Sequence, residues 1–288
     1  MKRFLKFALE VDTIMRPNRY HNRLHVADVV QLMFLQTEAG GGPLHLLCAD
    51  PVIRLSAILA AAVHDLCHPG YSNGFLVKTK HPLVARYGTK ATAERMHVAA
   101  FRHLLTKPSM DFLSPLSAAE RERIFGYVED MVLATDMSDH LWWLQGEVPT
   151  DEDQQLKFRL CLAMKVADMS HTMREFDEHV KFVSYLKEES YRQGDREKAL
   201  GVPMSPGMDR TATVTQGRES QVAFMLTTVK PLLERWTFCS GACKLVAEME
   251  RSFSLNVHTW KVAPISGCRM ADRHKTQKKH TVAVTKWQ

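Results

Sequence analysis

The hydrophobic positions of this chain recur at helical spacing and not at strand spacing. Leu24, Val29, Leu32 and Met33 fall on one face if their segment is helical. Residues 51–63 are apolar nearly all round, which is typical of a helix buried in a core. No alternation of apolar and polar residues long enough for a strand occurs before the last few positions. We therefore expect an all-α fold, built as a single compact multihelical domain.

Further helices and the main loops follow from the same pattern. Ser117 and Glu120 have the spacing of a capping box, which predicts a helix that runs to Val132. Other helices are expected over residues 156–173, 175–192 and 219–236. Clusters of Gly, Pro and polar residues predict loops at 40–43, 149–153 and 201–217.

Composition excludes several classes of protein. The 288 residues are 45% hydrophobic and 24% charged, as in ordinary globular domains. No apolar run approaches the roughly 20 residues of a membrane span, so no membrane span is expected. Six cysteines without a CxxC pair indicate neither a zinc ribbon nor a disulfide framework. This cysteine usage fits a reducing compartment, so we expect a cytoplasmic protein.

The net charge of +6 owes much of its excess to the last twenty residues. A solvated tail is the ordinary interpretation of such a run, and a site for anionic lipid or an acidic partner is the alternative. The rest of the chain has no basic stripe interleaved with aromatic residues. We therefore expect no nucleic-acid partner.

Histidines and aspartates with metal-binding potential stand at three places along the chain. His21 and His25 are four residues apart, so they share a face if they lie on a helix. His64 and Asp65 end the apolar segment 51–63, where burial is costly unless the groups are paired or bind a metal. Asp168 interrupts another apolar helix. Each feature alone is usually structural, but together they form the pattern of an HD-type metal site.

Several segments resemble the signatures of the class I 3′,5′-cyclic nucleotide phosphodiesterases. The resemblance runs in order from Phe4 to Trp236, which makes it far more specific than one motif. It implies hydrolysis of the 3′ phosphoester of cAMP, cGMP or both. The matching segments are 20–25, 64–73, 134–140, 167–170, 191–197, 203–206 and 220–224.

The resemblance also implies roles for residues of the metal site. His21 matches the general acid, and a nearby carboxylate that the sequence does not single out is expected to keep it charged. Two divalent ions are implied, a tightly held Zn²⁺ and a Mg²⁺ that shares Asp65, with Mn²⁺ as an alternative for the second. The implied protein ligands are His25, His64, Asp65 and Asp168. The resemblance also implies that three residues hydrogen-bond the waters bound to the metals: His68, Glu94 and Thr135.

For the substrate, the resemblance implies a cyclic nucleotide held by its purine. Gln221 matches the residue that binds the purine edge, and Phe224 matches an aromatic clamp over the base, with Leu186 opposite. Other pocket positions are Tyr20, Asn73 and Asp136.

The ends of the chain depart from the family. Only 20 residues precede His21, so we expect a domain that lacks the family's N-terminal helices, and regulatory domains outside this chain. The expected catalytic domain covers 1–240, and 241–288 is expected to be a divergent basic segment that could be disordered.

Two rival functions stay open. One is a truncated, catalytically weak fragment that binds cyclic nucleotide or a partner. The other is an HD-type hydrolase of other nucleotides, against which the pair Gln221 and Phe224 argues.

Overall fold

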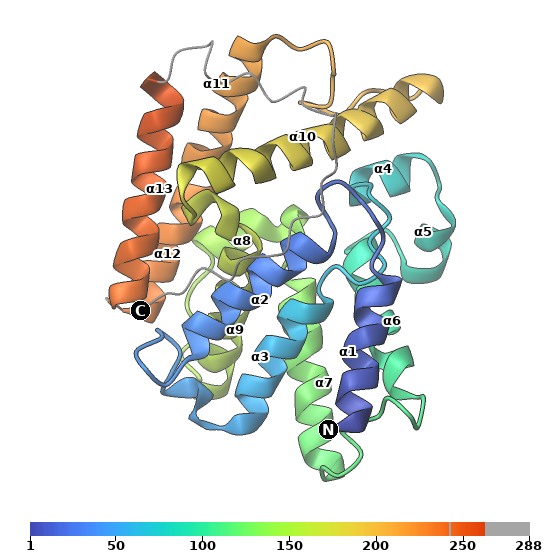
Figure 1. Cartoon of the computed structure of the whole chain (residues 1–288), viewed down its shortest axis with the longest axis vertical. Helices are drawn as coiled ribbons and strands as arrows, with labels where there is room; N and C mark the ends of the chain where they lie inside the picture. The colour runs from blue at the N-terminus through green and yellow to red at the C-terminus, as the bar shows by residue number, and fades with distance from the viewer. Residues whose placement is uncertain (242, 263–288) are drawn as a thin grey trace, which may run out of the picture.

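The computed structural model describes residues 1–241 and 243–262, and within them every regular element is helical (Figure 1). The expected all-α fold is therefore confirmed. The basic residues at the end of the chain, in the expected segment 241–288, lie outside the described residues from 263 onward. Over the described part, no helix is both long and apolar enough to cross a bilayer.

Four helices form the centre of the molecule. They are α2 (Arg23–Thr37), α3 (Pro51–Val63), α7 (Ala118–Leu133) and α9 (Glu152–Asp168), and each packs against the next. Ala57, Ala60 and Ala61 of α3 are fully buried, and such small side chains let neighbouring helices approach closely. α3 has the bounds that the apolar run 51–63 predicts.

The remaining helices surround this centre. α4 (Asn73–Lys78), α5 (Pro82–Tyr87) and α6 (Thr92–Leu105) lie on one side of the molecule. α11 (Val214–Phe224), α12 (Lys230–Ser240) and α13 (Lys244–Val262) lie on the other, and α10 (Phe176–Ala199) crosses between the two groups (Figure 1). α1 (Lys2–Ile14) lies beside α6, and α8 (His140–Gln145) contacts α12.

Several helix ends differ from the sequence-based expectation: α9 begins at Glu152 and not at 156, and α10 ends at Ala199 and not at 192. The helix expected over 156–173 ends at Asp168, and a 3₁₀ turn, η3 (Ser170–Met173), follows it. The helix expected from 219 begins at Val214, because Thr213 and Gln216 form a capping box. Ahead of Pro231 this helix widens into a π-helical turn, η4 (Met225–Val229), since proline can neither donate to nor fit a regular helix. The capping box at Ser117 is confirmed.

α13 is packed firmly against the rest of the molecule. Phe253 and Trp260 are buried, whereas Trp287, which could also have packed, lies outside the described residues. Asn256 is buried and donates hydrogen bonds to the carbonyl oxygens of Thr172 at 2.9 Å and Arg174 at 2.8 Å. The packed body thus continues past residue 240 to the end of α13.

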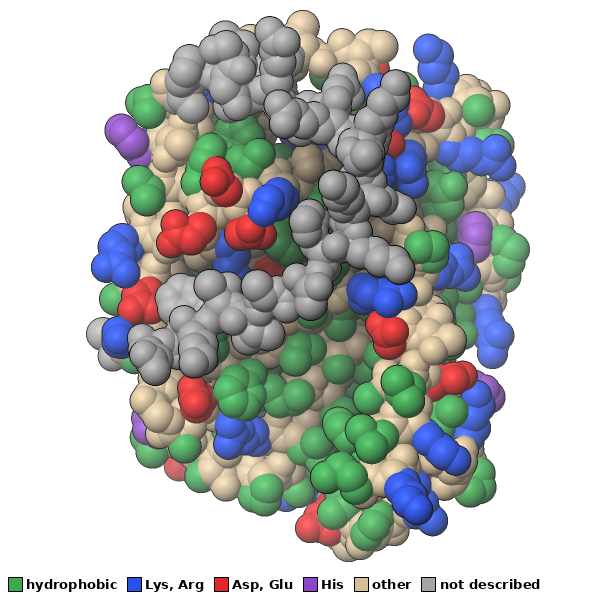
Figure 2. Space-filling view, viewed as in Figure 1, with side chains coloured by type: hydrophobic (Ala, Val, Ile, Leu, Met, Phe, Trp, Pro, Cys, Tyr) green, Lys and Arg blue, Asp and Glu red, His purple; other side chains and the backbone are tan. Residues whose placement is uncertain are grey.

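One face of the molecule carries exposed hydrophobic side chains. Figure 2 shows them gathered in its lower part, where Figure 1 places α1 and the lower ends of α3 and α7. On α1, Phe4, Leu5 and Leu9 are exposed while Phe7 and Val11 of the same helix are buried. α1 is therefore apolar on its outer side as well as on the side that it buries.

Asn256 gives a test of how α13 is held. We expect Asn256→Ala to lower the free energy of unfolding by about 1–3 kcal/mol, because the buried carbonyl group of Thr172 and the partly buried carbonyl group of Arg174 lose their donor. Denaturant unfolding measures the change, with Ser254→Ala, at an exposed position of the same helix, as the control. If Asn256→Ala and Ser254→Ala had equal free energies of unfolding, the two hydrogen bonds of Asn256 would not hold α13 in place.

Candidate active site

Four donor atoms from three separate segments converge in the interior of the molecule. They are Nε2 of His25, Nε2 of His64, an oxygen of Asp65 and an oxygen of Asp168. Every pair among them that includes a histidine is separated by 3.0–3.4 Å. A tetrahedral shell of such donors around Zn²⁺ places them about 3.3 Å apart, so the spacing is that of a metal centre.

The helix ends explain why these side chains meet. His25 lies in the first turn of α2, which Asn22 caps by accepting a hydrogen bond from the backbone of Leu24. His64 and Asp65 follow directly after α3, and Asp168 is the last residue of α9. Because α2 packs on both α3 and α9, these ends are brought together at one place.

The chemistry of the donors also fits a cation. His64 donates from Nδ1 to the carbonyl oxygen of Ala61 at 2.8 Å, so Nε2 is the ring nitrogen that faces the other donors and would bind a metal after losing its proton. Oδ2 of Asp65 is buried and has no hydrogen-bond donor among the described residues. Burial alone raises the pKa of Asp65 and of Asp168. The neighbouring histidines outweigh burial and lower both pKa values, and His64 has the largest effect on Asp65. Both carboxylates are therefore charged and available to a metal.

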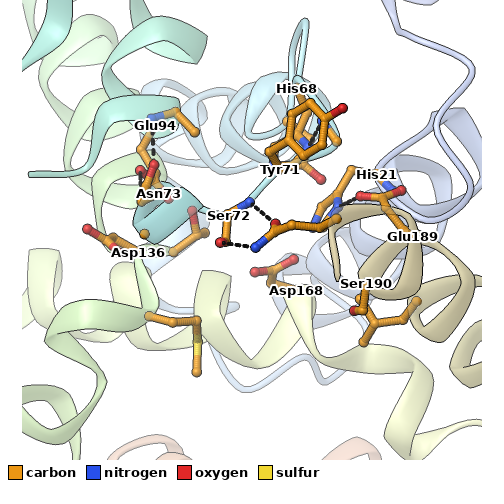
Figure 3. Close-up of a pocket in the computed structure, with 18 of the residues that line it drawn as sticks. His21, His68, Tyr71, Ser72, Asn73, Glu94, Asp136, Asp168, Glu189 and Ser190 are labelled. Atoms are coloured by element: carbon orange, nitrogen blue, oxygen red, sulfur yellow. Dashed lines mark hydrogen bonds and ion pairs between the residues drawn. The ribbon is translucent and has the colours of Figure 1, made fainter. Parts of the chain in front are cut away.

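A second pair of titratable groups lies beside this centre. Nδ1 of His21 lies 2.5 Å from Oε1 of Glu189, which comes from α10 (Figure 3). The other carboxylate oxygen of Glu189 accepts hydrogen bonds from the backbone N–H groups of Tyr20, at 2.7 Å, and His21, at 3.2 Å. Glu189 thus fixes both the ring and the backbone of His21.

This pairing controls the charge of His21. Burial alone lowers its pKa, but the negative charge of Asp65 and the hydrogen bond to Glu189 outweigh burial and raise the pKa to about 9. The ring of His68 stacks on that of His21, with the ring centroids 3.9 Å apart. Burial and the positive charge of His21 lower the pKa of His68. At neutral pH the ring of His21 is therefore protonated, and it stacks on the neutral ring of His68.

The centre opens into a cavity of about 400 Å³. Asn73, Glu94 and Asp136 lie on one side of it, His21 and Glu189 lie on the other, and Asp168 lies between them (Figure 3). Asn73 donates a 2.8 Å hydrogen bond to Glu94. Burial raises the pKa of Glu94 to about 7. The residues predicted for the site that line the cavity are His21, Asp65, His68, Asn73, Glu94, Thr135, Asp136, Asp168 and Leu186.

Three predicted substrate residues lie elsewhere. Gln221 and Phe224 on α11, and Tyr20, are not among the residues that line this cavity. Gln221 is buried, and its Nε2 has no hydrogen-bond acceptor within the described residues. The Tyr20 ring lies behind the metal centre, 4.6 Å from the ring of His25.

Two residues of the site were missed by the sequence analysis. Glu189 lies 168 positions from His21, on a helix rich in charged residues, so nothing in the sequence marks it. His97 points Nε2 at the second oxygen of Asp65, at 3.9 Å, and donates from Nδ1 to the carbonyl oxygen of Leu66 at 2.6 Å. It lies three residues after Glu94, one helical turn away, and that spacing could have found it.

The helical fold and the cluster of four donors fit a metal-dependent enzyme, and comparison with known proteins shows the family. A sequence model of the 3′5′-cyclic nucleotide phosphodiesterase family matches residues 20–249. The chain therefore belongs to this family.

Curated relatives agree with this assignment. A "Probable 3′,5′-cyclic-AMP phosphodiesterase pde-4" of Caenorhabditis elegans is 33% identical, over 80% of this chain and 36% of its own length. A "Dual specificity calcium/calmodulin-dependent 3′,5′-cyclic nucleotide phosphodiesterase 1B" of Mus musculus is 34% identical, over 78% of this chain and 42% of its own length. The chain thus spans less than half the length of these relatives.

A solved structure shares the fold. The structure of LmjPDEB1 in complex with IBMX superposes with a TM-score of 0.79 at 26% identity. The match covers 90% of this chain and 79% of the other.

The pair of His21 and Glu189 gives a direct prediction. In protein stripped of divalent ions, we expect Glu189→Gln to lower the pKa of His21 from about 9 by about 1–2 units, because the ring loses a charged partner. NMR titration of the histidine rings measures the shift. Glu178→Gln, at an exposed position of the same helix, serves as the control. A His21 pKa that is equal in both variants would refute the role given to Glu189.

Proposed function

We propose that this chain hydrolyses the 3′ phosphoester of cAMP, cGMP or both to the nucleoside 5′-monophosphate. The observation that carries the proposal is the pair of His21 and Glu189 beside the four-donor centre, with His21, Glu189, Asp65 and Asp168 lining one cavity. A metal centre suits an anionic phosphodiester, and an adjacent acid suits an alcohol leaving group. The printed names of the relatives, as cyclic-AMP and dual-specificity cyclic nucleotide phosphodiesterases, favour this substrate class.

The chemistry needs one water and one proton at defined atoms. The oxygen of the water attacks phosphorus, the bond from phosphorus to O3′ breaks, and O3′ takes the proton that His21 carries. The proton that the water loses passes to solvent, and His21 takes up a proton from solvent before the next turnover. Glu189 keeps His21 charged and oriented for this donation, and it can stabilise the imidazolium throughout. Without a metal the pKa of His21 is raised to about 9 by Asp65 and Glu189, and the Glu189 carboxylate remains against the ring to favour its protonated form when Asp65 binds a cation.

The metal centre is proposed to hold two divalent ions. His25, His64, Asp65 and Asp168 would hold the first, for which Zn²⁺ suits the mixture of nitrogen and oxygen donors. Asp65 would be shared with a second, Mg²⁺ or Mn²⁺, because its two oxygens face different histidines. Such ions neutralise phosphate charge and lower the pKa of the attacking water. His68, Glu94 and Thr135 would hydrogen-bond the waters of this second site.

Binding of the purine is proposed for the two residues on α11. Gln221 has a buried amide whose Nε2 has no acceptor among the described residues, as expected of a group that pairs with a ligand. Phe224 is one helical turn away and would stack on the base, with Leu186 opposite. Tyr20, Asn73 and Asp136 would shape the pocket.

Cytoplasmic localisation and regulatory domains outside this chain stay predictions.

A non-catalytic fragment that only binds cyclic nucleotide is not favoured. All four donors of the proposed metal centre are present and close together, and Asp65, Asp168 and His21 line the same cavity. The packed helices also continue beyond the region that the family pattern matches.

Turnover of cAMP and cGMP by the purified chain tests the proposal. We expect hydrolysis that needs a divalent ion and stops on chelation. His21→Ala should lower kcat by about 10²–10⁴-fold, because the leaving oxygen loses its proton donor. Asp168→Ala should abolish turnover through loss of the metal.

His258→Ala and Asp153→Ala are matched controls at exposed positions. Both should retain wild-type rates. A folded, metal-loaded wild-type chain with no turnover of either nucleotide would overturn the proposed function.

A further inference from the structure

Outside the metal centre, one carboxylate is more completely enclosed than any other in the described chain. Glu197 of α10 is fully buried and accepts four hydrogen bonds. Two come from Ser205, from its backbone N–H at 2.6 Å and from its hydroxyl at 2.7 Å. The others come from Nζ of Lys78 at 2.9 Å and Nε2 of Gln193 at 3.0 Å. We call this group of side chains the Glu197 clamp.

The clamp joins α4 to α10 and to the loop that directly follows α10. Lys78 ends α4, Gln193 and Glu197 lie on α10, and Ser205 lies in the loop of residues 201–213. Lys78 also donates to the carbonyl oxygen of Pro203 and to the Ser205 hydroxyl. The loop is therefore fixed to α4 and α10 at once.

The same network reaches the cavity wall. Gln193 accepts from the backbone N–H of Ser72 at 2.8 Å and donates to the Ser72 hydroxyl at 3.0 Å. Ser72 and Gln193 both line the cavity, as does Met208 of the loop. Figure 3 shows Ser72 joined by dashed lines to an adjacent side chain between Asp136 and Glu189. One buried carboxylate thus supports cavity-lining residues from three segments.

The loop backbone rests directly on α10. A Cβ added at Gly194 would lie 1.9 Å from the carbonyl oxygen of Met208, so only glycine permits this contact. Farther out, Arg210 pairs with Glu188 and Asp195, but these pairs are partly exposed and such pairs contribute little. The buried carboxylate is the stronger attachment, because removing one partner of an enclosed charge leaves the others unpaired.

Glu197 must be ionised to accept all four of these hydrogen bonds. Burial alone raises the pKa of Glu197, but hydrogen bonds from Ser205, Lys78 and Gln193 outweigh it and lower the pKa to about 2. The carboxylate is therefore ionised at neutral pH and can accept from all its donors. A neutral amide would present N–H groups to at least one donor.

We propose that Glu197 is a positioning residue that holds loop 201–213 in place as a wall of the substrate cavity. This inference rests on the proposed function for its kinetic consequence, although the loop attachment itself does not. Opening the clamp removes the wall that Met208 forms, while His21, Glu189 and the metal ligands stay in place. Substrate binding is then weakened and the chemical step is spared.

Glu197→Gln tests the proposal by two independent measurements on the full chain. The first is the rate at which trypsin cuts after Arg210 in the native protein, which should rise at least tenfold as the loop detaches. The second is steady-state kinetics with cAMP and cGMP, where KM should rise about tenfold and kcat should stay within threefold. Glu178→Gln, the same change at an exposed position of α10, should alter neither.

Gly194→Ala provides a second route if Glu197→Gln fails to fold. It displaces Met208 by steric contact and leaves the carboxylate unchanged. Its control is Gly126→Ala on α7, where an added Cβ meets nothing within 4 Å. Gly194→Ala should reproduce both the faster cleavage and the higher KM.

The outcomes separate the two proposals. Unchanged cleavage after Arg210, or a fall in kcat at constant KM, would overturn the role of Glu197. If the wild-type chain turns over neither nucleotide, the proposed function fails, and the cleavage rates alone decide whether the clamp holds the loop.

Discussion

The structure depends on the convergence of two histidines and two aspartates in the interior. Burying such groups is costly unless they are paired or bind a cation. Their donor atoms lie 3.0–3.4 Å apart, close to the spacing in a tetrahedral metal shell. The arrangement of α2, α3 and α9 is therefore best understood as a frame for this centre, with each ligand at a helix end. Metal binding and the packing of the central helices should stabilise each other.

In the proposed function, the pair of His21 and Glu189 adds a proton donor to the metal centre. Metal ions can neutralise a phosphodiester, but the leaving alkoxide still needs a proton. Burial disfavours the charged imidazole, and the charge of Asp65 together with the hydrogen bond to Glu189 outweighs burial, as the proposed proton donation requires. Glu189 also accepts from the backbone of Tyr20 and His21, so one residue of α10 sets the orientation of His21 and contributes to its charge. α10 therefore serves both the acid and, through Glu197, the cavity wall.

The sequence predicts a metal site at these four residues because several of them stand out locally. His64 and Asp65 end a run that is otherwise apolar, and Asp168 interrupts another, so their cost of burial is visible without a structure. The extent of α3 was also predictable, since Pro51 starts it and apolar residues fill it. The role of Gln221 and Phe224 at the purine stays a prediction that rests on family resemblance.

What the sequence did not reveal depends on long-range contacts. Glu189 and Glu197 look like ordinary charged residues of an amphipathic helix, and only the fold shows that both are buried. The end of α9 at Asp168 was missed because the apolar pattern continues into η3. α13 was not anticipated, because its two hydrogen bonds from Asn256 to residues 172 and 174 join segments more than 80 positions apart.

The central claim is that the four donors hold a catalytic metal ion, and anomalous diffraction from crystals of the metal-loaded protein tests it most directly. Fluorescence from the crystals identifies the metal, and data collected at its absorption edge locate it. The account predicts a strong anomalous peak at about 2 Å from the donor atoms of His25, His64, Asp65 and Asp168. A peak elsewhere, or ordered side chains at the four residues with no peak between them, would contradict it.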